Sequence, residues 1–291
     1  MKLYYYINTG HRVGLDRLRR SAPVISALRQ IGVDVTMLTN DFRAGEYAKE
    51  HLGIEKYVSV DVVRNIANIA TPEDTLVFDS QEENRAMWDA MAAYFRGFVR
   101  VSDDPEDFIS AGEGLISSMK SGEGILTVDI VNPRYFESGE YDGGTWYFWG
   151  DDDYERRLLA LADAFCGLDV SLLEGYYFFL QYGDELGNKF KRVEDSERYD
   201  EILMRAECFL SSSPQSVLEA MAAGARPVYI QKPGIALAWK RKMQSVGVPV
   251  VEDFSAEAIA QAMAETFVIN RKVLRKDAAL EAAHYIKDKL S

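Results

Sequence analysis

Polar side chains with strong hydrogen-bonding capacity cluster between positions 213 and 219. Ser213, Gln215 and Ser216 lie at the predicted start of a helix, where unpaired backbone amides and the helix dipole favour an anion such as phosphate. Glu219 follows roughly one turn later, and its carboxylate can accept hydrogen bonds from two vicinal hydroxyls, such as those of a ribose. The alternative is an ordinary crossover helix with a surface glutamate, and spacing alone leaves both interpretations open.

The residues around this cluster predict the elements that hold it. The apolar run 208–210 indicates a strand, and the serines and proline of 211–214 indicate a loop and a helix N-cap. Apolar residues then recur at helical spacing as far as Gly224, a typical helix stop, and 226–231 indicates the next strand. The segment is therefore a β-α-β unit, in which a ligand would meet the end of a strand and the start of a helix.

The run S-x-x-S-V-L-E-A-M-A-A-G-A-R-P-V, which begins at Ser213, resembles the nucleotide-binding segment of the two-domain glycosyltransferase fold called GT-B. It is closest to the group that contains MurG and PseG, the UDP-sugar hydrolase of the pseudaminic-acid pathway. In that group the glutamate holds the nucleotide ribose and the helix start holds the diphosphate. The resemblance thus implies that Ser213, Gln215, Ser216 and Glu219 bind a nucleotide sugar.

The same resemblance implies an α/β fold of two Rossmann-like domains with a ligand cleft between them. We expect residues 1–150 to form the acceptor and catalytic-loop domain and residues 151–291 to form the nucleotide-sugar-binding domain. The likeness extends over roughly residues 1–254. It implies a UDP-sugar as the substrate, with no separate cofactor and no metal, because a helix dipole and arginines can neutralise a diphosphate leaving group.

The loop after the first predicted strand departs from the family pattern. The pseudaminic-pathway hydrolases carry G-x-G-H-x-x-R there, and their histidine is thought to activate water. Here Gly14 and Arg20 are kept, whereas Asp16 replaces the second glycine and Arg17 replaces the histidine. Because arginine stays protonated, Arg17 cannot be a general base near neutral pH.

Two residues of this loop can replace the missing base. His11 lies six residues before Arg17, and Asp16 can also accept a proton. His11 can equally be an ordinary exposed histidine. Arg17 and Arg20 belong to a dense basic cluster, which is either solvated or positioned to clamp a phosphate or carboxylate.

Weaker family matches continue into the second half of the chain. Gly183 and Asp184 stand where the family has a G-G-x-D loop, which is shortened here. Lys232 stands in place of an asparagine-glutamine pair. It can supply a charged contact to the ligand, and it equally indicates a changed ligand.

Composition excludes some functions. With 291 residues, a net charge of −13 and a sequence pI near 4.8, the chain lacks the basic face that nucleic-acid or membrane-surface binding requires. No signal peptide or membrane span is visible, and the two cysteines, both in apolar surroundings, indicate buried thiols in a reducing cytoplasm. The oligomeric state is left open by the sequence.

Four segments carry specific structural expectations. Residues 145–149 are expected to close the first sheet, and the acids 151–153 to form a solvated helix cap, with a metal site as the alternative. Residues 176–181 read as the first buried strand of the second domain, and 273–290 as a helix that packs back across the hinge.

Three functions remain open on these residues. The overall likeness favours a UDP-sugar hydrolase of surface-glycan synthesis, whereas the lost histidine favours a glycosyltransferase or altered chemistry. The third is a non-catalytic sugar-nucleotide or glycan-binding relative, in which Arg17 and Lys232 mark a site converted to binding.

Overall fold

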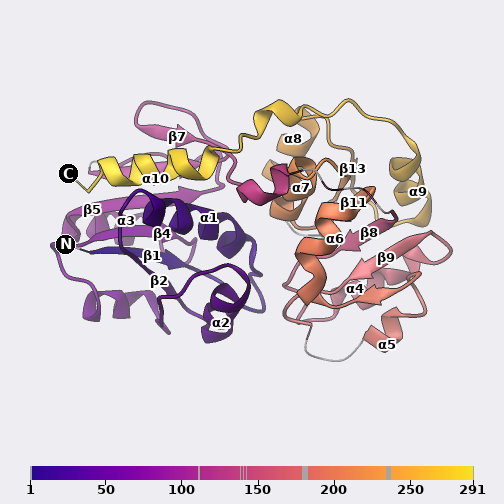
Figure 1. Cartoon of the computed structure of the whole chain (residues 1–291), viewed down its shortest axis with the longest axis horizontal. Coiled ribbons are helices and arrows are strands. Elements are labelled where there is room, and N and C mark those ends of the chain that lie inside the picture. Colours follow the sequence, from indigo (N-terminus) through magenta and orange to yellow (C-terminus); the bar gives the residue numbers. More distant parts are fainter. Residues whose placement is uncertain are drawn as a thin grey trace. The chain divides into compact units, whose positions relative to one another are not determined.

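The computed structural model describes residues 2–110, 112–137, 139, 141, 143–178, 183–233 and 237–290, with backbone alone for positions 183 and 184. The chain is an α/β protein with two parallel β-sheets (Figure 1). It divides into two compact units. Unit 1 comprises Met1–Gly10, Arg17–Asn132 and Arg275–Ser291, and unit 2 comprises His11–Asp16 and Pro133–Leu274. Each unit has the Rossmann-like form that the sequence predicts.

Unit 1 contains, within the described residues, a seven-stranded sheet of order β3-β2-β1-β4-β5-β6-β7. Its strands are β1 (Leu3–Ile7), β2 (Val35–Thr39), β3 (Tyr57–Ser59), β4 (Thr75–Asp79), β5 (Gly97–Ser102), β6 (Glu113–Ser117) and β7 (Ile125–Thr127). Its helices are α1 (Asp16–Gln30), α2 (Phe42–His51), α3 (Arg85–Tyr94), α10 (Ala278–Asp288) and the 3₁₀ helix η1 (Val63–Asn68). The central strands are buried throughout their length, as expected of a parallel sheet covered on both faces.

Unit 2 contains, over its described ranges, a six-stranded sheet of order β10-β9-β8-β11-β12-β13. Its strands are β8 (Thr145–Phe148), β9 (Val170–Leu173), β10 (Val193–Glu194), β11 (Cys208–Ser211), β12 (Arg226–Ile230) and β13 (Val250–Val251). The helices are α4 (Arg157–Leu161), α5 (Gly183–Leu186), α6 (Tyr199–Arg205), α7 (Pro214–Ala222), α8 (Leu237–Ser245) and α9 (Ala256–Ala264). Short 3₁₀ helices are η2 (Pro133–Phe136), η3 (Ala162–Phe165), η4 (Ser196–Arg198) and η5 (Arg271–Val273).

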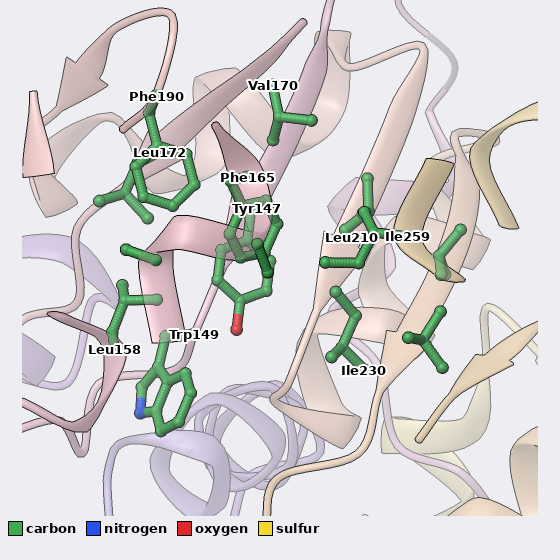
Figure 2. Packing of buried hydrophobic residues seen from close by; sticks show 14 of the residues in the cluster. Tyr147, Trp149, Leu158, Phe165, Val170, Leu172, Phe190, Leu210, Ile230 and Ile259 are labelled. Carbon is green, nitrogen blue, oxygen red and sulfur yellow. The ribbon is translucent and has the colours of Figure 1, made fainter. Parts of the chain in front are cut away.

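One hydrophobic cluster of unit 2 covers one face of this sheet (Figure 2). The Tyr147 ring stacks on Phe165 with 4.5 Å between centroids, and Phe165 in turn lies 4.8 Å from Phe190. Leu210 and Ile230 from neighbouring strands complete the same face. The core therefore fixes β8, β11 and β12 side by side, and the residues that follow these strands emerge at one edge.

The structure corrects two strand assignments. Residues 145–148 form β8 within the second sheet, where β8 pairs with β9 and β11, so they do not close the first sheet. Tyr176 and Tyr177 lie in a turn, and 179–181 fall outside the described residues; the buried strand of this region is Val170–Leu173. The aromatic residues at 176–179 have high β propensity and so predict a strand there. The strand that pairs with β8 is β9 instead, and this pairing outweighs the local propensity.

The C-terminal helix α10 returns to unit 1, as the sequence predicts (Figure 1). The Tyr285 hydroxyl donates to the Gly124 carbonyl at 2.6 Å and accepts from the Leu115 amide at 2.9 Å. Both partners belong to the β6–β7 edge of the sheet. The helix therefore completes the core of the unit in which the chain begins.

A buried ion cluster ties β5 to β6. Arg100 donates to Asp107 at 2.6 Å and to Glu113 at 2.9 Å, and its guanidinium lies 4.3 Å from the centre of the Trp88 ring. Burial would lower the pKa of Arg100, but its hydrogen bonds to Glu113 and Asp107 and the charges of these two carboxylates together outweigh burial and raise that pKa. Arg100 thus stays charged and balances two buried carboxylates.

We expect Arg100→Met to lower the free energy of unfolding by about 3 to 5 kcal/mol, because it leaves Asp107 buried without this counter-ion and Glu113 with Arg85 in place of two arginines. Arg198→Met is the matched control, since Arg198 bridges Glu194 and Glu201 at the surface, where ion pairs contribute little. Urea unfolding of both variants measures the difference. Equal stability losses would contradict a structural role for burial of the Arg100 cluster.

Candidate functional site

Polar residues converge where three neighbouring strands of unit 2 end. Gly150–Asp152 follow β8, Ser212–Ser213 follow β11, and Gln231–Lys232 follow β12. The sheet order reverses between β8 and β11, because the chain goes from β8 to β9 and β10 and then returns to β11 on the other side. In open parallel sheets, ligands bind outside the carboxyl ends of the strands at such a switch point. This edge is the candidate site.

Helix α7 starts at this edge with the predicted cap. Ser213 is the N-cap in extended conformation, its Oγ accepts from the Ser216 amide at 3.1 Å, and Pro214 occupies the first turn. The Ser213 amide donates to Ser211 Oγ at 3.0 Å. The expectation that the amides of Ser213 and Ser216 are unpaired is therefore wrong, because neighbouring serine hydroxyls already accept from both.

Glu219 lies one turn into α7, at 0 % exposure. Its Oε2 accepts from the Tyr199 hydroxyl at 2.6 Å, and its Oε1 accepts from Gln215 Nε2 at 3.0 Å. The sequence places Glu219 at the ligand surface, whereas the structure encloses it behind α6 and η2. In this conformation Glu219 anchors the first turn of α7, and the ribose contact expected for it is not open to solvent.

A second, partly exposed carboxylate lies close to Glu219. Arg134 of η2 forms an ion pair with Asp200, and the Tyr135 hydroxyl donates to the same Asp200 oxygen. Burial, followed by the charges of Glu219 and Asp200, raises the pKa of Tyr135, so its phenol stays neutral. The carboxylates of Glu219 and Asp200 therefore both interact electrostatically with the guanidinium of Arg134.

The loop His11–Asp16 belongs to unit 2 and reaches the candidate site. The Ser213 hydroxyl donates to Asp16 Oδ1 at 2.6 Å, a short charge-assisted hydrogen bond. Gly14 adopts φ +79°, and a Cβ there would lie 3.7 Å from Asp152 Cβ and 3.8 Å from Asp151 Cβ. A small residue at Gly14 lets the loop backbone approach the end of β8.

Of the two candidate bases, Asp16 is the one in contact with α7. The ring of His11 packs against Tyr154 with 4.4 Å between centroids. Asp16 is half-buried, and its carboxylate accepts from the N-cap hydroxyl of Ser213. The geometry therefore favours Asp16 over His11 for proton transfer at the start of this helix.

Arg17 and Arg20 lie in unit 1, and both are turned toward Asp79. Arg20 donates to both Asp79 oxygens, at 2.8 and 2.5 Å, and to Asp103 at 2.5 Å. Burial alone would raise the pKa of Asp103, but the charge and hydrogen bond of Arg20, together with a hydrogen bond from Ser118, outweigh burial and hold that pKa below its usual range. Arg17 lies 3.6 Å from Asp79. The guanidinium of Arg20 is therefore neutralised inside unit 1, which argues against its predicted role as an anion clamp.

The acids 151–153 are largely buried, which corrects the expectation of a solvated cap. Asp151 and Asp153 are each 1 % exposed. Asp153 accepts from the amides of Arg157 and Leu158 and so caps α4, while Asp151 accepts from the Tyr176 amide at 3.0 Å. No group of three or more His, Cys, Asp or Glu side chains among the described residues is arranged to hold a metal ion.

Lys232 supplies a cation to this edge. Its Nζ lies 2.5 Å from Asp152 Oδ1 and 4.9 Å from the centre of the Trp149 ring. A Cβ at Gly150, where φ is +119°, would lie 2.8 Å from Asp152 Oδ1 and 3.0 Å from Lys232 Nζ. Glycine at position 150 thus makes room for the ion pair, which stands beside Ser213.

The chain was compared with known proteins. No protein-family model and no characterised protein matches its sequence. Its structure is similar to that of UDP-GlcNAc 2-epimerase of Methanocaldococcus jannaschii in complex with UDP-GlcNAc and UDP, with a TM-score of 0.64, 12 % identity, and coverage of 99 % of this chain and 100 % of the other. The chain has the GT-B fold.

Two further similar structures have the same fold. Staphylococcus aureus MnaA in a co-structure with UDP gives a TM-score of 0.61 at 10 % identity, covering 98 % of this chain and 94 % of the other. Spinosyn rhamnosyltransferase SpnG complexed with spinosyn aglycone gives 0.61 at 11 % identity, covering 99 % and 96 %. At such identities these similarities establish the GT-B fold, and none of the three singles out the pseudaminic-acid hydrolases.

Several residues of this GT-B site were not predicted from the sequence. Tyr199 binds both Ser216 and Glu219, and Asp152 is the partner of Lys232. Tyr199 comes from a separate helix, so no local spacing connects it with α7. Gly183 and Asp184, which were predicted, begin α5, and their side chains are outside the described residues.

No helix in the described ranges is long and apolar enough to cross a membrane.

We expect Ser213→Ala to destabilise the protein more than Ser255→Ala. Both serines are N-caps, so each variant loses about 1 kcal/mol of capping energy. Ser213→Ala also removes the donor to the Asp16 carboxylate, at a further cost of about 1.5 to 3 kcal/mol. Denaturant unfolding of both variants checks this. Losses of the same size would show that the Asp16 contact contributes no stability.

Proposed function

We propose that this protein is a glycosyltransferase that uses a nucleotide sugar, with a UDP-sugar as the donor, in surface-glycan synthesis. Asp16 is the base that accepts the proton of the acceptor hydroxyl. The observation that carries the proposal is the contact of the Asp16 carboxylate with Ser213, at the start of α7 and at the switch point of a GT-B sheet. Structures of similar fold that hold UDP or UDP-GlcNAc support this choice of donor.

Donor binding is assigned to the carboxyl edge of unit 2. The diphosphate would lie near the positive end of α7 and near Lys232, whose ammonium is directed to this edge by Trp149 and Asp152. When the bond between the anomeric carbon and the diphosphate breaks, negative charge develops on the leaving oxygen. A helix dipole and a buried ammonium stabilise that charge, which is the contribution that electrostatic catalysis needs.

The chemistry of the N-terminal loop favours transfer over hydrolysis. The histidine that would activate water in the hydrolases is Arg17 here, and the Arg17 guanidinium is directed toward Asp79 and Asn8. The loop instead offers the half-buried carboxylate of Asp16. A carboxylate can orient and deprotonate the hydroxyl of an acceptor, so the proposed acceptor is a molecule that presents a hydroxyl group.

A second function, a non-catalytic sugar-nucleotide or glycan-binding relative, is favoured by the charges around the start of α7. Glu219 is enclosed, and the Asp16 carboxylate stands at the start of α7, where the phosphate of a nucleotide is expected. Asp151, Asp152 and Asp153 add negative charge along the same edge. This negative charge opposes the charge that develops on a diphosphate leaving group, so it favours binding without transfer.

The two functions are separated by measuring ligand binding and turnover together. Thermal unfolding is followed with UDP, GDP, CMP, TDP and several UDP-sugars, because a ligand that binds only the folded state raises the melting temperature. UDP-selective stabilisation together with UDP release from a sugar donor supports the transferase. Stabilisation without release supports the binding relative. No response to any nucleotide would overturn both.

For the transferase we expect Asp16→Asn to lower kcat by roughly 10²- to 10⁴-fold, the usual contribution of a general base, while UDP still stabilises the protein. The amide keeps the shape of the side chain and an acceptor for Ser213. His11→Ala is the control and is expected to leave kcat within a few-fold of wild type, since His11 packs against Tyr154. A greater loss in His11→Ala would transfer the role of base to that histidine.

A further inference from the structure

The three acids that follow β8 differ in their surroundings. Asp151 and Asp153 are each 1 % exposed, and backbone amides donate to both carboxylates. The Asp152 side chain between them is 25 % exposed. Asp152 is therefore the member of this run that a ligand can reach at the edge of unit 2 where β8, β11 and β12 end.

An ion pair fixes one oxygen of the Asp152 carboxylate. Lys232 Nζ lies 2.5 Å from Asp152 Oδ1, and the Lys232 side chain is only 9 % exposed. The same ammonium lies 4.9 Å from the centre of the Trp149 ring, which holds it by a cation–π contact. Among the described residues, no hydrogen-bond donor is found for Asp152 Oδ2. Lys232 thus orients the carboxylate and leaves its second oxygen to a ligand.

Two glycines set the position of this carboxylate. Gly150 and Gly14 have φ of +119° and +79°, in the left-handed region that favours glycine. A Cβ on Gly150 would lie 2.8 Å from Asp152 Oδ1, and a Cβ on Gly14 would lie 3.7 Å from Asp152 Cβ. The backbone therefore passes close to Asp152 on two sides, and a larger residue at position 150 would displace the ion pair.

The Asp152–Lys232 pair offers a ligand both signs of charge side by side. The Lys232 ammonium attracts a phosphate oxygen, whereas the Asp152 carboxylate repels one and can bind a ligand only through hydrogen-bond donors. A nucleotide sugar has both kinds of group, because a ribose and a second sugar adjoin its diphosphate and both carry hydroxyls. The charges at this edge therefore suit a diphosphate beside Lys232 and hydroxyls beside Asp152.

We propose that Asp152 accepts hydrogen bonds from hydroxyl groups that adjoin the diphosphate of a bound nucleotide sugar. The family resemblance gives such a contact to Glu219, but Glu219 is 0 % exposed and accepts from Tyr199 and Gln215 inside the protein. Asp152 lies at the same carboxyl edge and can be reached without movement of these side chains. The inference rests on the nucleotide-sugar site of the proposed function and deepens it, because it names the groups of the donor that the site recognises.

This contact makes binding depend on the hydroxyls of the ligand. A hydrogen bond to an ionised carboxylate is stronger than one between neutral groups. A ligand without the hydroxyl leaves the Asp152 oxygen without its donor, at an edge that the bound ligand shields from water. We expect such a ligand to bind about 10- to 100-fold more weakly, the usual range for hydrogen bonds to charged groups.

Calorimetric titration with three ligands tests the proposal. UDP carries the ribose diol, 2′-deoxy-UDP lacks its 2′-hydroxyl, and UDP-GlcNAc adds a sugar beyond the diphosphate. If Asp152 contacts the ribose, Asp152→Asn lowers the preference for UDP over 2′-deoxy-UDP by about tenfold or more. If Asp152 contacts the second sugar, the same variant lowers the affinity for UDP-GlcNAc relative to UDP by a similar factor.

The asparagine keeps the shape of the side chain and an oxygen for Lys232, and it turns an NH₂ group, which cannot accept from a hydroxyl, toward the ligand. Urea unfolding checks that the variant is folded. Asp152→Ser, which also lacks the carboxylate, is a second variant in which the same ratio falls.

Two further variants are controls for charge and for the family contact. Glu155→Gln removes an exposed carboxylate close to Asp152 in the sequence that pairs with Arg157 at the surface, so both affinity ratios stay unchanged. Glu219→Gln also leaves both ratios unchanged, because the ligand does not reach the enclosed position 219. A ratio that falls in Glu219→Gln but not in Asp152→Asn would return the contact to Glu219 and overturn the proposal.

The same titrations separate this contact from the proposed function. Unchanged ratios in Asp152→Asn, or equal gains in affinity for all three ligands, would leave Asp152 as a partner of Lys232 that only repels phosphate. Either result, with nucleotide binding intact, overturns the Asp152 contact and keeps the proposed function. A wild type that binds none of the three ligands overturns both.

Discussion

The hydrogen bond from Ser213 to Asp16 is the contact on which the candidate site depends. It joins the first loop of the chain to the N-cap of α7, two segments separated by 197 residues. His11–Asp16 belongs to unit 2, whereas the chain on either side of it belongs to unit 1. The half-buried carboxylate of Asp16 is thereby held at the ends of β8, β11 and β12, where a GT-B fold has its ligand-binding edge.

This edge balances acids against a small number of cations. Asp151 and Asp153 are held by backbone amides, and Asp152 is held by Lys232, so each acid has a structural partner. The arginines expected to face a phosphate are used elsewhere, since Arg20 is fully engaged by Asp79 and Asp103 inside unit 1. The dipole of α7 and Lys232 supply positive potential at the edge. An anionic ligand can use both.

Local chemistry made part of this structure predictable. Rules that act within a few residues predict the strand, the serine cap, the proline in the first turn and the helix that stops at Gly224. The assignment of β8 to the second sheet and the burial of Glu219 depend on distant partners, namely β11 and Tyr199. The same holds for Asp151–Asp153, which look solvated by composition and are enclosed by the folded chain. The local sequence pattern therefore located the site, whereas contacts between residues far apart in the sequence determine what each side chain does.

The enclosed glutamate limits what a ligand can do at α7. In the family that the sequence resembles, a glutamate at this position receives ribose hydroxyls, whereas here Tyr199 and Gln215 each donate to one of its oxygens inside the protein. A ribose diol could reach this carboxylate only if the side chains that enclose it moved, because Glu219 is 0 % exposed. A ligand that binds this edge without such a movement contacts the residues that follow β8, β11 and β12 and leaves Glu219 in its structural role.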